Sequence, residues 1–159
     1  MKRDPRLQTL SWEHHDALVL ASRILRGLEK GADPEQIRSY LVTAWEGHMR
    51  PHFRAEEEFL LPLMDFSAEA EQVTDRVLAD HRRFAELVAE IRADGDRLPE
   101  ILRQFVELLR SHVRLEEREL FPAAESGLSQ ECLEEMSLKL VAAHEANVFD
   151  KDSGTAFWK

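Results

Sequence analysis

Two short segments of the chain carry histidine and glutamate at the same spacing. The sequence reads HFRAEEEFLLP from His52 and HVRLEERELFP from His112, so each segment contains His-x-x-x-Glu. On a helix, residues four apart lie on one face about one turn apart, so His52 can pair with Glu56, and His112 with Glu116. Imidazole nitrogen and carboxylate oxygen are donors for iron, manganese or zinc, and a carboxylate can bridge two cations.

A single pair of this kind is usually a surface contact, so the repetition is what favours a metal site. The chain also carries an acidic residue followed by histidine on the helix before each segment, with apolar residues at matching offsets behind it. Two helical hairpins related by an approximate two-fold axis would bring all these side chains together. The six candidate ligands are His14, His52, Glu56, His81, His112 and Glu116.

Four neighbouring residues could add a ligand or support the site. His15 is adjacent to His14 and points about 100° away, and the inner face of the helix favours His14. His48 lies one turn before His52 and could add a ligand, but its counterpart in the second segment is a leucine. Glu57 and Glu117 are rotated about 100° from the paired glutamates; they can accept hydrogen bonds from ligand imidazoles or form a solvated edge.

Other residues that could do chemistry lack partners in the sequence. His144 has no accompanying motif and is interpreted as a non-ligand, and Cys132 has no base beside it, so no catalytic side chain is assigned. The aromatic residues are expected to belong to the core or to a lid that keeps the site dry. They are Trp12, Trp45, Phe53, Phe59, Phe84, Phe105 and Phe121.

The elements that position these residues are predicted to be helices, which gives an all-α fold. Gly31 stops the first helix, Asp33 caps the second, and Ser129 can cap the last. The expected helices run from about 10 to 28, 35 to 61, 68 to 93, 99 to 121 and 129 to 148, with a kink or break at Pro51 and a frayed end over 151–159. Short connections predict an up-down-up-down four-helix bundle over about 10–122, with a shorter C-terminal fifth helix over one end or along a groove.

Composition limits the class of protein. The chain has 159 residues, 43% of them hydrophobic, which suits one domain over 1–159. A net charge of −10 disfavours nucleic acid and anionic membranes as partners. One cysteine excludes an internal disulfide, and neither a membrane span nor a signal peptide is visible. We expect a cytoplasmic protein, monomeric or homodimeric.

With these residues in this order, the chain resembles the hemerythrin-like family, also called the HHE cation-binding domain, over roughly residues 10–122. The order His, His-x-x-x-Glu, His, His-x-x-x-Glu is quite specific to that family. The resemblance implies a four-helix bundle with the same six residues as ligands. It also implies two non-haem iron ions, with manganese or zinc as alternatives, bridged by Glu56, Glu116 and an oxo or hydroxo group.

The chain departs from the oxygen-carrying hemerythrins at two points. They have a further histidine four residues from the third-helix histidine, where this chain has Val77 and Ala85, and an aspartate where it has Glu117. These departures disfavour simple reversible oxygen carriage. The pattern is more similar to members that sense oxygen or iron, react with nitric oxide or peroxide, or repair iron–sulfur clusters, although the repair proteins usually have a Cys-containing domain not seen here.

The resulting hypothesis is a di-iron protein that binds or reacts with oxygen, nitric oxide or peroxide, in sensing or stress response. Its redox or protein partner is not identified by the sequence. The alternatives are an iron- or oxygen-responsive interaction module without turnover, a detoxifying di-iron enzyme, or a scaffold with a single ion. A ferritin-like bundle is disfavoured, because no histidine here has glutamate three residues before it.

Overall fold

The computed structural model describes residues 2–93, 95–147, 150–152, 154 and 156–159. Within these ranges the chain consists of helices joined by turns and short loops, with no strand, which confirms the predicted all-α fold. None of the helices described there is both long enough and apolar enough to cross a membrane.

The first half of the chain forms a helical hairpin whose turn agrees with the sequence signals. α1 ends just before Gly31, whose positive φ of 71° is one that other residues rarely adopt. Asp33 then caps the next helix by accepting a hydrogen bond from the amide of Glu35. The elements of this half are η1 (Pro5–Leu7), α1 (Gln8–Glu29), α2 (Pro34–Ala44), η2 (Trp45–Met49), α3 (Arg50–Ala55), η3 (Glu56–Leu60) and η4 (Leu61–Leu63).

The second half forms another hairpin followed by a shorter helix. Ser67 and Ser129 cap two of these helices by accepting amide hydrogen bonds, and the cap at Ser129 confirms the prediction. Asp94, in the predicted turn, and Val148, the predicted end of the last helix, lie outside the described residues. The elements are α4 (Ala68–Arg92), α5 (Leu98–Leu115), η5 (Glu116–Leu120), α6 (Phe121–Gly127) and α7 (Gln130–Glu145).

Three wide, π-helical turns interrupt the long helices. The turns η2, η3 and η5 each end two residues before a proline, namely Pro51, Pro62 and Pro122. A proline inside an α-helix lacks an N–H donor and clashes with the carbonyl four residues earlier, and a wider turn relieves both problems. Pro51 therefore does not break its helix. The predicted end of the fourth helix at Phe121 is wrong, because α6 continues past Pro122 to Gly127.

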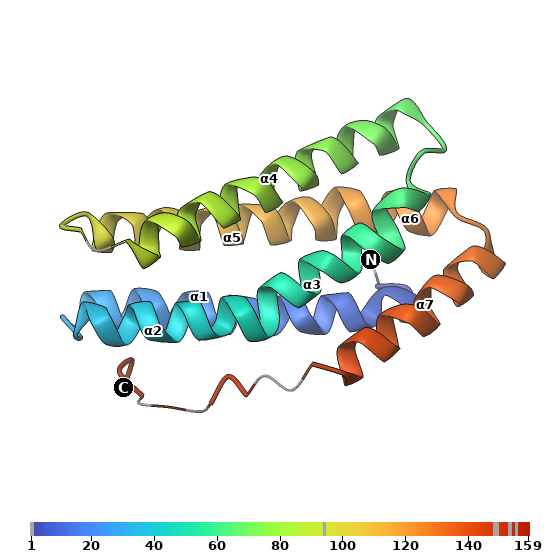
Figure 1. Cartoon of the computed structure of the whole chain (residues 1–159). Coiled ribbons are helices and arrows are strands. Elements are labelled where there is room, and N and C mark those ends of the chain that lie inside the picture. The colour runs from blue at the N-terminus through green and yellow to red at the C-terminus, as the bar shows by residue number, and fades with distance from the viewer. Residues whose placement is uncertain (1, 94, 148–149, 153, 155) are drawn as a thin grey trace.

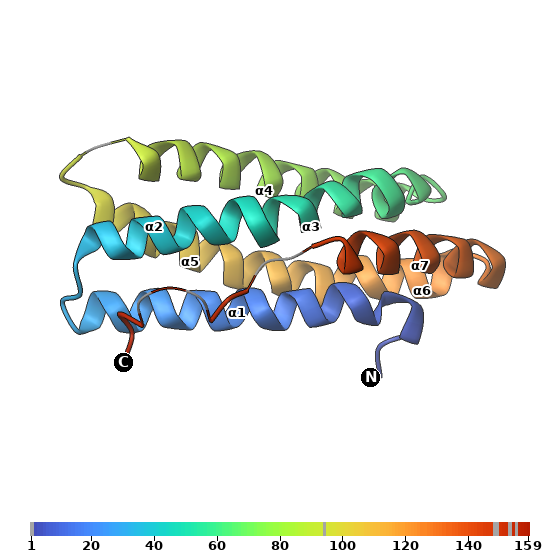
Figure 2. The same cartoon turned by 60° about the horizontal axis from the view of Figure 1, so that its bottom comes forward.

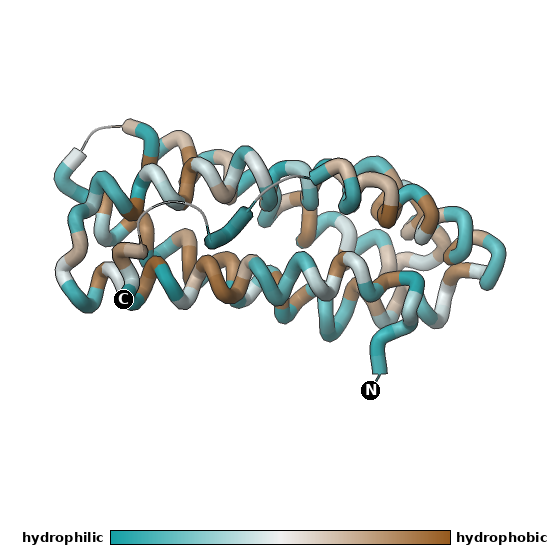
Figure 3. The backbone as a smooth tube through the Cα atoms, turned by 90° about the horizontal axis from the view of Figure 1, so that it is seen from below, coloured by the Kyte–Doolittle hydropathy of each residue, from teal (hydrophilic) through white to brown (hydrophobic). Residues whose placement is uncertain are grey.

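The helices pack as an up-down-up-down bundle (Figure 1). α1 lies beside α2 and α5, and α4 lies beside the same two helices. α7 packs against α1 and α3 at one end of the bundle, as Figure 2 shows after rotation. Apolar and polar residues alternate along the helices (Figure 3), as expected for helices that are buried on one face.

The core consists of two apolar clusters with polar residues between them. On α1, His14 follows Leu10 of one cluster and precedes Ala17 of the other. His81 lies in the same way between Val77 and Phe84 on α4. The interior therefore has a polar middle with an apolar core on each side.

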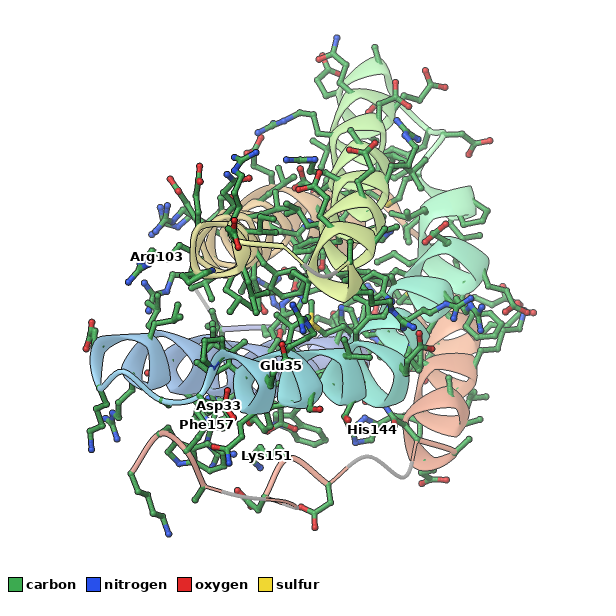
Figure 4. The ribbon with its side chains drawn as sticks, turned by 60° about the vertical axis from the view of Figure 1, so that its left-hand side comes forward. Asp33, Glu35, Arg103, His144, Lys151 and Phe157 are labelled. Atoms are coloured by element: carbon green, nitrogen blue, oxygen red, sulfur yellow. The ribbon has the colours of Figure 1, made fainter. Side chains whose placement is uncertain are left out.

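The end of the chain, predicted to be frayed, packs on the bundle instead. Phe157 is 9% exposed and Trp158 is 7% exposed. The Phe157 ring meets the Tyr40 ring edge-on at 5.1 Å between centroids, and the Arg23 guanidinium lies 4.3 Å from the centroid of Trp158. Figure 4 shows Phe157 on this returning segment beside the bundle. Two isolated aromatic residues carry no helical period, so sequence periodicity could not reveal this contact.

Candidate metal centre

The structure brings all six predicted ligands together in the interior of the bundle. They form two groups, and within each group the candidate ligand atoms lie within 4.8 Å of one another. Each side chain is buried, with an exposed fraction between 0% and 7%. The first group is His14, His52, Glu56 and Glu116, and the second is Glu56, His81, His112 and Glu116. We name the surroundings of His14 and His52 the first position, and those of His81 and His112 the second position.

Four helices supply the imidazoles, and two wide turns supply the shared carboxylates. The histidines come from α1, α3, α4 and α5. Glu56 and Glu116 are each the first residue of a π-helical turn, so both His-x-x-x-Glu pairs lie across the same kind of junction. Wide turns of this kind often occur at functional sites.

Each shared carboxylate lies between a histidine of one position and a histidine of the other. Glu116 Oε2 is 2.8 Å from His14 Nε2, and its Oε1 is 2.9 Å from His112 Nε2. Glu56 Oε1 is 3.2 Å from His52 Nε2 and 3.4 Å from His81 Nε2. This is the placement that carboxylates bridging two cations would need.

Several buried polar atoms at the centre lie within ion-pair distance of one another but make no hydrogen bond of good geometry among the described residues. They are the Nε2 atoms of His52, His81 and His112, both carboxylate oxygens of Glu56, and Oε1 of Glu116. Leaving such atoms unpaired costs free energy, and cations held by them would offset that cost. The residues present therefore fit a metal centre with nitrogen and oxygen donors.

A second layer of carboxylates holds the opposite nitrogen of every imidazole. His14 Nδ1 donates to Glu117 at 2.9 Å and His81 Nδ1 to Glu57 at 3.0 Å, across the two hairpins. The other two contacts lie within a hairpin: His52 Nδ1 with Glu13 and His112 Nδ1 with Asp80, both at 3.0 Å. Because a carboxylate accepts, the proton is on Nδ1, and Nε2 is left to face the centre.

Two of the four outer carboxylates, Glu57 and Glu117, are candidates from the sequence. The sequence left open whether Glu57 and Glu117 form a solvated edge or accept from ligand imidazoles, and the structure shows the second. It did not assign Glu13 and Asp80, although each directly precedes a candidate ligand histidine. That repeated acidic-His pair was the available signal.

The charges at the centre shift the pKa values of its groups. Burial acts to lower the pKa of His81, but Glu116 and Glu56 outweigh it and raise the pKa to about 9. Burial likewise opposes the increase at His112, where Glu116 and Asp80 raise the pKa to about 10. The pKa of Glu116 lies well below its usual value despite burial, because of His112 and its other partners. Without a metal, protons occupy the place of cations.

The remaining histidines do not join the centre. His15 is exposed, which agrees with the preference for His14. His48 is buried, but its Nε2 faces the carbonyl oxygen of Glu13 at 3.1 Å, which places it beside the centre. His144 on α7 lies with Nδ1 3.2 Å from Glu13 Oε2, a contact that the sequence did not indicate.

Aromatic rings enclose the imidazoles. Phe53 stacks on His81 with ring centroids 4.1 Å apart, and Phe121 stacks on His14 at 5.3 Å. Phe84 meets His112 edge-on at 5.4 Å. The expectation for Trp12 is wrong: its side chain is 59% exposed, because it lies on the face of α1 opposite the inner residues.

Comparison with known families agrees with this geometry. The family described as the hemerythrin HHE cation-binding domain matches residues 7–124, a range that includes all six candidate ligands. The chain belongs to the hemerythrin family. The matched range ends before α7, so the shorter helix and the returning C-terminal segment lie outside it.

The chain also resembles part of a longer protein. A protein of Nostoc sp. (strain PCC 7120) called DNA nickase is 28% identical to this hemerythrin-family chain over 147 residues. The match covers 89% of this chain and 40% of that protein, so the chain spans less than half of its relative. No solved structure matches the chain significantly.

Proposed function

We propose that the chain holds two iron ions and binds or reacts with oxygen, nitric oxide or peroxide, in sensing or stress response in the cytoplasm. The observation that carries this proposal is the set of buried nitrogen and oxygen atoms that face one another without hydrogen-bond partners. Two imidazoles for each position and two shared carboxylates suit iron or manganese, with zinc as another candidate. The carboxylates would also offset part of the cations' charge.

A small apolar space beside the first position supports a small ligand. A cavity of about 10 Å³ adjoins His14, His52 and His112 and is otherwise lined largely by apolar side chains such as Ala17 and Phe53. That volume is about what one water-sized molecule needs. A diatomic molecule or peroxide fits this scale, whereas a metabolite-sized substrate does not.

When bound, a reduced iron pair supplies electrons and open coordination positions for such a ligand. The chain's own residues orient the donors and exclude water. The outer carboxylates keep each Nδ1 protonated, and the stacked rings of Phe53 and Phe121 limit rotation of two imidazoles. No buried side chain is placed as a nucleophile, so the protein's part is positioning.

The proposal is tested by metal content and optical spectra. We expect the chain, loaded anaerobically with Fe²⁺, to retain two iron ions and to develop near-ultraviolet absorption on oxidation. Addition of nitric oxide to the reduced protein should change the spectrum. Glu116→Gln should lose these features, while Glu119→Gln, an exposed neighbour on the same turn, should keep them. A chain that retains no iron would contradict the proposal.

Turnover separates the two alternative uses of the same centre. A detoxifying enzyme would consume peroxide or nitric oxide catalytically in a steady-state assay. An interaction module would show a large metal-dependent change in melting temperature or protease sensitivity without consumption. We favour binding without sustained turnover, because no buried side chain at the centre is placed as a nucleophile.

DNA cleavage, suggested by the name of the Nostoc relative, is a weaker proposal. The chain's net charge of −10 opposes binding to the phosphate backbone, and the relative has more than half of its length outside the match. We expect the iron-loaded chain to leave supercoiled plasmid intact when catalase removes peroxide. Metal-dependent nicking that Glu116→Gln abolishes would favour the nickase instead.

A further inference from the structure

The four outer carboxylates follow the approximate two-fold axis, but their surroundings do not. Glu117 and Glu13 serve the first position, and Glu57 and Asp80 serve the second. The exposed fractions of the first two side chains are 29% and 6%, against 46% and 26% for the second two. Each carboxylate of the first position is thus more buried than its counterpart.

Glu117 is fixed by two further donors. Ser11 Oγ donates to its Oε1 at 2.7 Å, and Arg3 Nη2 donates to its Oε2 at 2.9 Å. Arg3 also pairs with Glu125, and its guanidinium lies 5.1 Å from the centroid of Phe121, the ring stacked on His14. The N-terminal segment therefore holds both the carboxylate and the ring that orient His14.

Glu13 makes an ion-pair contact with α7. Its Oε1 accepts from His52, while its Oε2 lies 3.2 Å from Nδ1 of His144 on α7. Figure 4 shows His144 at the end of α7 nearest the returning segment. The family match ends before this helix, so His144 is a contribution from outside the matched bundle.

The second position lacks both supports. Among the described residues, Glu57 and Asp80 have only their imidazoles as side-chain hydrogen-bond partners. The residue that corresponds to Ser11 in the repeat is Leu78, which cannot donate a hydrogen bond. Aromatic rings contact the imidazoles of both positions, because Phe121 stacks on His14 while Phe53 stacks on His81 and also meets His52 edge-on.

We propose that the two metal positions are inequivalent, and that the first holds its ion more tightly while the second exchanges first. This inference rests on the two-metal centre proposed above. An outer carboxylate already held in place keeps its imidazole oriented at less entropic cost, whereas an exposed carboxylate rotates and bonds to water. Arg3 and His144 are therefore positioning residues for the first position.

Release of iron to a chelator tests the inference. The chain is loaded anaerobically with Fe²⁺, its iron content is measured, and a coloured ferrous chelator then reports release with time. We expect two phases of one iron each, with rates that differ about tenfold or more, the scale of losing an outer hydrogen-bond partner. Loading below two irons would refute the two-metal centre itself, which separates that failure from failure of the inference.

Matched variants assign the phases. Glu57→Gln should accelerate the fast phase several-fold, and Glu117→Gln, the same change at the corresponding position, should accelerate the slow one. Arg3→Met and His144→Gln should accelerate only the slow phase. Arg76→Met, which removes an exposed ion pair with Glu119, should change neither.

Three results would overturn the inference. They are equal release rates at both positions, acceleration of the slow phase by Glu57→Gln, and an Arg3→Met variant that melts earlier without a change in either phase. The last result would show that Arg3 only stabilises the fold. The slow phase should be faster in His144→Ala than in His144→Asn, because asparagine keeps a donor nitrogen near the place of Nδ1.

Discussion

Each candidate ligand histidine has a carboxylate at both ring nitrogens. At His14, Nε2 faces the shared Glu116 and Nδ1 faces the outer Glu117. The outer contact keeps the proton on Nδ1. When the imidazole is neutral, Nε2 therefore has the free lone pair and is directed at the centre. The direction of a histidine therefore matters as much as its presence, and adjacent histidines are not interchangeable.

The pair of adjacent histidines on α1 gives a matched test of this point. His14→Gln should weaken metal binding by more than the roughly 10–100-fold cost of losing an outer partner, because it removes a donor. His15→Gln should leave affinity unchanged, because His15 is exposed. Metal stoichiometry and competition with a chelator measure both effects. Equal losses in the two variants would contradict the assignment.

Metal affinity should also rise with pH. Because the pKa is about 9 for His81 and about 10 for His112, both imidazoles are mostly protonated between pH 6.5 and 8.5, and a metal must displace these protons. The apparent affinity should therefore increase by up to about tenfold per pH unit for each proton released. Anaerobic Mn²⁺ titrations between pH 6.5 and 8.5, corrected for the competing chelator, would detect this. A flat profile would contradict it.

At the scale of elements, the sequence predicts the helices and the six candidate ligands that the structure brings together, but not how the helices continue past the prolines. Residues four apart on a helix share a face whatever the tertiary structure, so His52/Glu56 and His112/Glu116 could be paired from spacing alone. The wide turns were missed, because a π-helical turn has no periodic signature of its own. The helix contacts of Glu13 and Asp80 depend on how helices pack, which one helix's sequence does not determine.

The returning C-terminal segment gives a test at this scale. A methyl group added at Gly27 on α1 would lie 2.6 Å from the Phe157 ring. Gly27→Ala should therefore destabilise the chain, although alanine is otherwise favoured over glycine in a helix by ~0.5–1 kcal/mol. In a Phe157→Ala background the clash is absent, and the same substitution should become neutral or stabilising.

Chemical denaturation of the four proteins in this cycle measures the coupling. Phe157→Ala alone should cost about 3 kcal/mol, the lower end of the usual range for a lost phenylalanine ring, because this ring lies at the edge of the core. Ala156→Gly, next to Phe157 on the same segment, is a control that should cost less. If Gly27→Ala has the same effect in both backgrounds, the segment does not pack on α1 in solution.

At the scale of the whole molecule, the candidate metal centre lies between two apolar clusters. One cluster contains residues of α1, α2, α4 and α5, and the other contains residues of α1, α4, η3, η5, α6 and α7. A chain of 159 residues can bury enough apolar surface to fold without a metal, unlike a small zinc domain. Metal should therefore adjust stability and leave the fold in place.

Removing the metal should lower the melting temperature while helix content at 25 °C stays the same. At a free metal concentration of 100 times the Kd, binding contributes about 2.7 kcal/mol, which corresponds to roughly 5–10 °C for a domain of this size.

The metal-free protein should also lose stability as pH rises from 6.5 through 9–10. His81 and His112 have raised pKa values in the folded state, so their bound protons stabilise the folded state at low pH and are lost as pH rises through those values. The loaded protein has no such protons to lose, so the difference in melting temperature should widen with pH. Circular dichroism and calorimetry at several pH values measure both trends. A metal-free chain that is unfolded at 25 °C would show that the two clusters do not stabilise the bundle sufficiently without metal.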